Sequence, residues 1–229
     1  MTPADLDREA IKAEFQRERG YWRPWNETLL REQPGFLISY ARYAGHPART
    51  GPLSMRMVEL IYVALDASSS HLFESGLRIH MQKAKEAGAS PQDIFDVLHL
   101  VAEQGLSCAL QSIQVLAQET GDEPPPQRSA AEHAWAWLQQ HDPAYAELTR
   151  AFCQSASDNA GLPSSERCLV RIALHSCFTA FNPDALRACI REGLGHGLTT
   201  AQMLQAIQLG AHLSVHGTAL GAQVFDSLK

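Results

Sequence analysis

Residues 53–100 read LSMRMVELIYVALDASSSHLFESGLRIHMQKAKEAGASPQDIFDVLHL, and the expected fold depends mainly on this stretch. Its apolar side chains recur every three to four residues, as on one face of an α-helix, and no segment alternates as a half-buried strand does. Ser54 and Ser90 stand where helix N-caps are expected, and Gly88 stands where a helix would stop. The pattern predicts helices over about 55–67, 71–87 and 91–104.

The helical pattern continues on both sides of this stretch. On the amino-terminal side it predicts helices over 5–19, 26–32 and 36–43, the last two separated by a Pro-Gly pair. On the carboxyl-terminal side a further helix should end near residue 119. Residues 121–128 read GDEPPPQR, and consecutive prolines cannot continue a helix, so this segment is a predicted linker. The sequence therefore predicts an all-α protein.

A helical unit is expected to occur twice along the chain. A shift of 109 residues lays residues 53–117 on residues 162–226 without a gap, and Gly88 then falls on Gly197. The apolar positions and the helix break agree in phase as well, which predicts an internal duplication. The expected domains are residues 1–120 (an amino-terminal leader plus the first unit), residues 121–128 (the linker) and residues 129–229 (a second, degenerate unit).

Composition excludes several classes of function. The 229 residues have a formal net charge of −6, whereas a nucleic-acid-binding protein needs a basic face to release counterions. No apolar run is long enough to span a bilayer, and the first residues are polar rather than like a signal peptide. Five cysteines without close spacing are typical of a reduced compartment. We expect a cytoplasmic protein without nucleic-acid or membrane partners, and the absence of a glycine-rich nucleotide motif favours chemistry without a cofactor.

Several short stretches resemble one family: Glu59-Leu60-Ile61, residues 70–80 (SHLFESGLRIH), residues 84–90 (AKEAGAS) and residues 93–98 (DIFDVL). The chain is similar here to the carboxymuconolactone decarboxylase family, which also contains the AhpD-type alkylhydroperoxidases. The resemblance implies a helical bundle and a lyase that acts on a small cyclic or aromatic-derived acid or lactone. It also implies a homo-oligomer, since single-unit members form rings of six units. A trimer of the duplicated chain is favoured over a dimer.

The resemblance selects His80 as the general acid or base, with Glu59 and His71 as helpers. An imidazole titrates near neutrality, so it can protonate the enolate that decarboxylation leaves. Glu59 could orient that imidazole, or it could cap its own helix. If the helix began at His71, the two imidazoles would lie half a turn apart, so they can share a pocket only if His71 precedes the helix. His80 could also simply bridge two helices.

The candidate substrate-binding residues surround this position in the sequence or belong to the leader. The aromatic residues of the leader could line a pocket, or they could pack the leader onto the bundle. These candidates are Glu74, Phe73, Trp22, Trp25 and Tyr62.

Two rival functions remain open. An AhpD-type peroxidase carries a Cys-x-x-Cys pair that ends four residues before the histidine, where this chain has Phe73 and Gly76. A non-catalytic binding or scaffold protein would keep the fold without the chemistry. The second unit has lost the acid–base residues, because Cys168, Ala180 and Cys189 replace the three candidates of the first.

A metal site is the weaker alternative. His212 and His216 are four residues apart and would lie on one helix face, a spacing that can chelate a transition metal. They lack the intervening glutamate and the third histidine of the zinc protease signature. We therefore expect no metal, and we expect these histidines at a helix surface or an interface.

Overall fold

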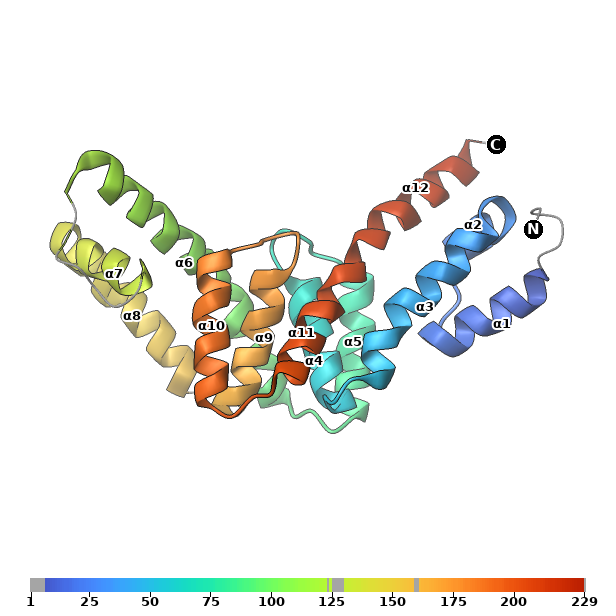
Figure 1. Ribbon diagram of the computed structural model, residues 1–229, viewed down its shortest axis with the longest axis horizontal. Coiled ribbons are helices and arrows are strands. Elements are labelled where there is room, and N and C mark those ends of the chain that lie inside the picture. Colours follow the sequence, from blue (N-terminus) through green and yellow to red (C-terminus); the bar gives the residue numbers. More distant parts are fainter. Residues whose placement is uncertain (1–6, 123, 125–129, 159–160, 229) are drawn as a thin grey trace. The chain divides into compact units, whose positions relative to one another are not determined.

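The computed structural model describes residues 7–122, 124, 130–158 and 161–228 of the chain. Within these residues the regular structure is helical, without a β-strand, which confirms the predicted all-α class (Figure 1). None of the described helices combines the length and the apolar composition that crossing a bilayer requires. The elements are α1 (Arg8–Arg19), α2 (Pro24–Glu32), α3 (Pro34–Thr50), α4 (Met55–Ala67), α5 (Glu74–Glu86), α6 (Pro91–Thr120), α7 (Ala130–His141), α8 (Pro143–Asp158), α9 (Ser164–Ser176), α10 (Pro183–Gly195), α11 (Thr200–Ala211), the 3₁₀ turn η2 (His212–Ser214) and α12 (Val215–Ser227).

The helix ends follow local capping chemistry. Ser54 caps α4 by accepting a hydrogen bond from the backbone N–H of Met57, and Ser90 and Asp93 form a reciprocal capping box at the start of α6. Gly20 ends α1 in the left-handed conformation at φ 73°, which glycine adopts without steric cost. The predicted helix starts after Ser54 and Ser90 are thus confirmed.

Three helix boundaries differ from the prediction. Helix α3 begins at Pro34 and runs to Thr50, because proline is well accepted in the first turn, where its missing N–H is not needed. Helix α6 continues to Thr120 instead of breaking near residue 104, and α7 and α8 pack against it. Helix α5 begins at Glu74, so His71 lies in the turn before the helix.

The contacts divide the chain into two compact units. The first comprises residues 1–52 and 211–229, and the second comprises residues 53–210. In the first unit, α1, α2, α3 and α12 surround the fully buried Phe15. The rings of Trp22 and Trp25 meet Phe15 edge-to-face, at centroid distances of 5.4 and 6.1 Å. Aromatic packing of this kind stabilises a helical cluster beyond the apolar area that it buries.

In the second unit, α4, α6 and α9 pack against one another. Helix α5 packs on α4, and α10 packs on α9, while α7 and α8 lie beside the end of α6 (Figure 1). The core of this unit is aliphatic and includes Leu60, Leu100, Ile172 and Leu209, each at most 1% exposed. Burial of such side chains, at roughly 25 cal/mol per Å² of apolar area, is the main force that holds the helices together.

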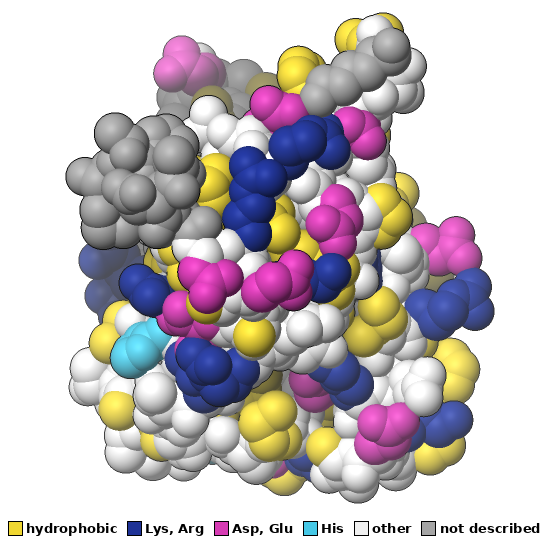
Figure 2. Space-filling view, turned by 90° about the vertical axis from the view of Figure 1, so that its right-hand side faces the viewer, with side chains coloured by type: hydrophobic (Ala, Val, Ile, Leu, Met, Phe, Trp, Pro, Cys, Tyr) yellow, Lys and Arg dark blue, Asp and Glu magenta, His cyan; other side chains and the backbone are white. Residues whose placement is uncertain are grey.

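The charges on the surface are of mixed sign. Figure 2 shows acidic and basic side chains interspersed with hydrophobic ones over one face of the molecule, without a broad basic field. Several of them are paired, as in the contact of 2.9 Å between Lys12 Nζ and Glu27 Oε1. This face agrees with the net charge of −6 and offers no basic stripe for a nucleic acid.

The second unit contains a repeated pattern of helices. Helices α9 and α10 and the start of α11 have the bounds of α4 and α5 and the start of α6, each displaced by 109 residues. The hydrogen bond from Phe73 N to Asp66 O (2.9 Å) has its counterpart from Asn182 N to His175 O (3.0 Å). These coincidences are what a duplication would produce. The duplication and its domain boundaries stay a prediction, and most of the expected linker, 121–128, lies outside the described residues.

One buried histidine predicts a pH dependence of stability. His175 on α9 is 4% exposed, and burial, with the nearby charge of Arg171, lowers its pKa to about 4. Because the folded-state pKa lies below the unfolded value of roughly 6.5, its contribution is complete above that pH and is lost as the pH falls toward 4. About 3 kcal/mol of the free energy of unfolding should disappear between pH 7 and pH 4, at roughly 1.4 kcal/mol per pKa unit.

Urea unfolding at several pH values measures this effect. The His175→Gln variant should lose stability over this range by about 3 kcal/mol less than the wild type. Replacing the exposed His196 by glutamine is the matched control and should leave the wild-type slope unchanged. Equal slopes for the wild type and His175→Gln would contradict the prediction.

Candidate functional site

Helix α4 supplies two carboxylates to one region of the second unit. Glu59 and Asp66 are seven residues apart, close to two helical turns, so their side chains emerge from the same face of α4. Both side chains are buried, at 7% and 2% exposed. Buried carboxylates require hydrogen-bond or charge partners, and α5 and the turn before it supply imidazoles. The sequence singled out Glu59 but not Asp66.

His80 on α5 lies between these two carboxylates. Its Nδ1 is 2.6 Å from Glu59 Oε2, and its Nε2 is 4.0 Å from Asp66 Oδ2. Because an ionised carboxylate only accepts hydrogen bonds, the short contact places a proton on Nδ1. In the neutral imidazole Nε2 is then the basic nitrogen. The His80 side chain is 23% exposed and its ring centroid is 4.6 Å from that of Tyr62, so it is held in place yet accessible from outside.

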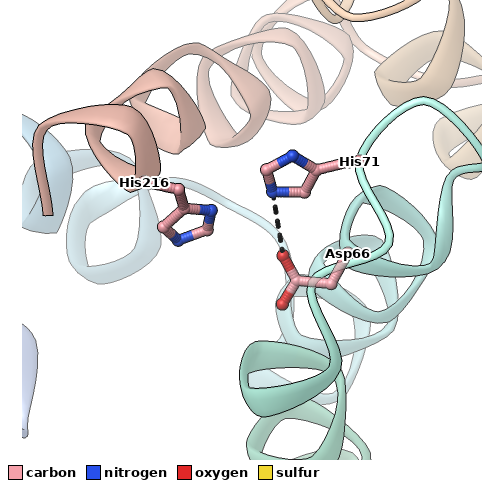
Figure 3. A group of neighbouring side chains, drawn as sticks. All are labelled: Asp66, His71 and His216. Atoms are coloured by element: carbon pink, nitrogen blue, oxygen red, sulfur yellow. Dashed lines mark ion pairs between the residues drawn. The ribbon is translucent and has the colours of Figure 1, made fainter. Parts of the chain in front are cut away.

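His71 approaches the same carboxylate from the turn between α4 and α5. Its Nε2 lies 3.8 Å from Asp66 Oδ1, which is the ion pair marked in Figure 3. Burial lowers the pKa of His71, which favours its neutral form. His216, also drawn in Figure 3, belongs to the other compact unit and is not part of this group. The two histidines can share one site because α5 starts after His71, which is the condition that the sequence geometry set.

The turn that presents His71 is fixed by its backbone. Leu72 has φ 47°, an unusual conformation for a residue with a side chain, and Phe73 N donates to Asp66 O at 2.9 Å. Ser68, which is buried, donates from its hydroxyl to Gln104 Oε1 at 3.0 Å. These bonds hold the turn against α4 and α6, and they thereby hold the imidazole beside Asp66.

Gly76 is needed for the close approach of α5 to Asp66. A Cβ at this position would lie 2.2 Å from Asp66 Oδ2 and 2.5 Å from Phe73 Cδ1. We expect Gly76→Ala to lower the free energy of unfolding by about 1–3 kcal/mol, the usual cost of overpacking, although alanine is the better helix former.

Gly105 provides the control for this substitution. It lies inside α6, and an added Cβ would have nothing within 4 Å. Gly105→Ala should therefore stabilise the protein by up to about 1 kcal/mol. Denaturant titration compares the two variants. A Gly76→Ala protein that is as stable as the wild type would show that Asp66 is not held in this position.

The other predicted substrate-binding residues have different locations. Phe73 lies beside the group, with its ring centroid 5.9 Å from that of His71. Glu74 is 82% exposed at the side chain and pairs with Arg78 on the solvent side of α5. Trp22 and Trp25 belong to the first unit, where they pack around Phe15 as described above. A role for these residues in substrate binding stays a prediction.

His212 is buried rather than exposed at a helix surface. It is 6% exposed, and its Nε2 lies 3.2 Å from Arg19 Nη2 within the first unit. A guanidinium only donates hydrogen bonds, so this contact requires the imidazole nitrogen to accept. That nitrogen cannot ligate a metal at the same time, which weakens the alternative of a metal held by His212 and His216.

In the second repeat the corresponding positions carry thiols. Burial is the main cause that raises the pKa of Cys168 to about 12 and that of Cys189 to about 11. Both groups are therefore neutral thiols near pH 7, whereas the thiolate is the nucleophile in cysteine chemistry. This region does not replace the Cys-x-x-Cys pair that an AhpD-type peroxidase would use.

Comparison with known proteins agrees with this architecture. A crystal structure from Burkholderia xenovorans LB400, described as a candidate gamma-carboxymuconolactone decarboxylase subunit, matches with a TM-score of 0.83 and 22% sequence identity. The match covers 97% of each chain and shows a shared fold. No curated protein matches the sequence. Residues 34–118, which carry all four of the side chains around His80, match the model of the "Carboxymuconolactone decarboxylase family". In this segment the chain belongs to the carboxymuconolactone decarboxylase family.

Proposed function

We propose that the chain is a decarboxylase-like lyase that acts on a small cyclic or aromatic-derived acid or lactone without a cofactor. The observation that carries the proposal is the placement of His80 between two buried carboxylates, Glu59 and Asp66. Membership of residues 34–118 in the carboxymuconolactone decarboxylase family supports the reaction class. The identity of the acid does not follow from the family, because one fold serves several chemistries.

The geometry suits proton transfer at carbon. When the bond to the substrate carboxylate breaks, carbon dioxide leaves and its electron pair passes into the conjugated carbonyl as an enolate. His80 in its protonated form would then give the Nε2 proton to the enolate carbon. Glu59 accepts from Nδ1 throughout, so it fixes the ring and stabilises the imidazolium before transfer.

Asp66 extends this arrangement to a second imidazole. It contacts His80 and His71 with different carboxylate oxygens, at 4.0 and 3.8 Å. A single buried carboxylate can neutralise one imidazolium at a time, so charge on either ring opposes charge on the other. Because burial favours neutral His71, the proton resides on His80, where the proposed reaction uses it.

A thermal-shift screen tests the proposal. Muconolactone-like acids and aromatic acids should raise the melting temperature of the wild type, and the same compounds should be converted, with release of carbon dioxide. His80→Gln should abolish the conversion. Gln82→Ala is the matched control, because this residue lies on the same helix and pairs with Glu86 on the exposed side. Binding without conversion in wild-type protein would favour the scaffold alternative, and peroxide consumption supported by a dithiol would favour a peroxidase.

We also propose that the chain forms a homo-oligomer, with a trimer favoured over a dimer. Helix α12 leaves Leu220, Val224 and Phe225 between 48% and 62% exposed, and apolar side chains grouped in this way are typical of an interface. Light scattering should give a multiple of the 25.2 kDa chain mass. Leu220→Glu should shift the protein toward monomer. A monomer mass for the wild type at micromolar concentration would refute the assembly.

A further inference from the structure

Three potential metal ligands come together in the second unit, away from the site around His80. Cys168 lies on α9, Glu192 on α10 and His196 at the end of α10. One donor atom from each, the Sγ, a carboxylate oxygen and a ring nitrogen, lies within 4.8 Å of the other two. We propose that these side chains bind a divalent transition metal ion, with Zn²⁺ as the ion that best fits the donors.

The geometry of the three donors suits a small ion. Zinc binds thiolate sulfur at about 2.3 Å and imidazole nitrogen or carboxylate oxygen at about 2.0–2.2 Å. Ligands bound to the same ion are therefore separated by roughly 3–4 Å. Glu192 Oε1 and His196 Nε2 are already 3.9 Å apart, since positions i and i+4 share a helix face. Three protein ligands leave a fourth place for water or a small ligand, as in catalytic zinc sites.

Two of the ligands can adjust, and the third is fixed. Cys168 is fully buried, and α10 packs closely on it, since a Cβ at Gly193 would lie 3.7 Å from Cys168 Cβ. The side chains of Glu192 and His196 are 41% and 42% exposed, so they can rotate the short distance toward an ion beside the sulfur. A fixed soft ligand with two mobile partners at the surface also gives the ion a path of entry from solvent.

The repeat provides an internal comparison. At the same offset of 109 residues, the first half of the chain carries Glu59, Lys83 and Ala87 in these three places. Lysine and alanine at the second and third places offer no ligand at neutral pH. The donor set therefore exists in one half alone, in the half that lacks the acid–base residues of the other.

The local charge is compatible with a divalent ion. Arg171 Nη2 lies 3.1 Å from Glu192 Oε1, so one carboxylate oxygen is already partnered. The carboxylate has a second oxygen that can face the ion, because a carboxylate offers about four lone-pair sites. A thiolate and a carboxylate together balance the charge of a divalent cation, and the guanidinium then helps to hold Glu192 in place as a second-shell partner.

Titration with Co²⁺ under reducing conditions tests the site. One ion per chain should bind, with an absorption band in the near ultraviolet from charge transfer between thiolate and cobalt. Zn²⁺ should displace the cobalt and remove the band. His196→Ala, at an exposed position that folding does not depend on, should weaken binding by roughly 100-fold or more. Cys168→Ser should remove the band altogether.

Two control variants make the result specific. Cys189→Ser removes a neighbouring buried thiol that is not among the three donors, and it should leave the band intact. His80→Gln should also leave it intact, so failure of the proposed lyase function would not affect this test. Absence of cobalt binding, or a band that survives His196→Ala with unchanged affinity, would overturn the proposal. If Cys168→Ser does not fold, the His196→Ala and Glu192→Gln titrations decide the question.

Discussion

Replacing Asp96 by alanine should lower the free energy of unfolding by about 3–5 kcal/mol, the usual effect of removing one partner of a buried ion pair. Asp96 on α6 is fully buried, and its Oδ1 pairs with Nη1 of Arg167 on α9. Its Oδ2 accepts a hydrogen bond of 3.0 Å from the backbone N–H of Leu162. The variant would leave the buried guanidinium facing Glu103 alone, at 3.9 Å, and would leave a buried N–H without its acceptor.

Equilibrium unfolding in urea measures this loss. Asp96→Asn keeps an oxygen for Leu162 but removes the charge, so it should retain part of the stability. Arg78→Gln is the control, since it breaks an exposed ion pair on α5 and should leave the unfolding midpoint almost unchanged. An Asp96→Ala protein that unfolds at the wild-type urea concentration would show that this pair does not join α6 to α9.

The helices could be predicted from the sequence because their signals are local. Ser54, Ser90 and Gly20 each act within one helical turn, and the structure has helix ends beside all three. The errors concern signals that tertiary contacts override. Pro34 begins a helix instead of ending one, and α6 runs past the expected break because α7 and α8 pack along it.

The candidate site was predictable in part for a similar reason. His80, His71 and Glu59 follow from a family resemblance that is carried by short local stretches. Asp66 was missed because no local signal distinguishes it from a surface acid at a helix end. The offset of seven residues from Glu59 was the available clue, since it places both carboxylates on one face of α4. Neither the sequence pattern nor the resemblance indicated the contacts of Asp66 with two imidazoles.

The two halves of the second unit differ in the chemistry that they can carry. The first repeat sets an imidazole against a carboxylate, His80 with Glu59, where the second has two neutral thiols, Cys189 and Cys168. A neutral thiol cannot act as a proton donor near pH 7 as an imidazolium can. The proposed acid–base chemistry therefore depends on the first repeat alone. Substitutions at Cys189 should not alter turnover.

His80→Gln should reduce turnover by a factor of about 10² to 10⁴, the usual contribution of a general acid or base. The substrate is a compound that the thermal-shift screen identifies. Glutamine has a polar end near the position of the imidazole but cannot carry the proton to carbon. Glu59 would lose its partner at 2.6 Å, and a buried carboxyl group can respond by taking up a proton. The fold should therefore survive the substitution while activity is lost.

Variants of the two carboxylates distinguish a positioning role from a purely structural one. Glu59→Gln and Asp66→Asn keep the size of each side chain but remove its charge. Each carboxylate favours the protonated imidazole, so each variant should lower the pKa of His80 and move the acidic limb that requires imidazolium toward lower pH. Glu59→Gln should have the larger effect, because its contact is 2.6 Å rather than 4.0 Å. A merely structural role would lower the melting temperature and leave the pH profile of turnover in place. Full activity in His80→Gln would place the chemistry elsewhere in the chain.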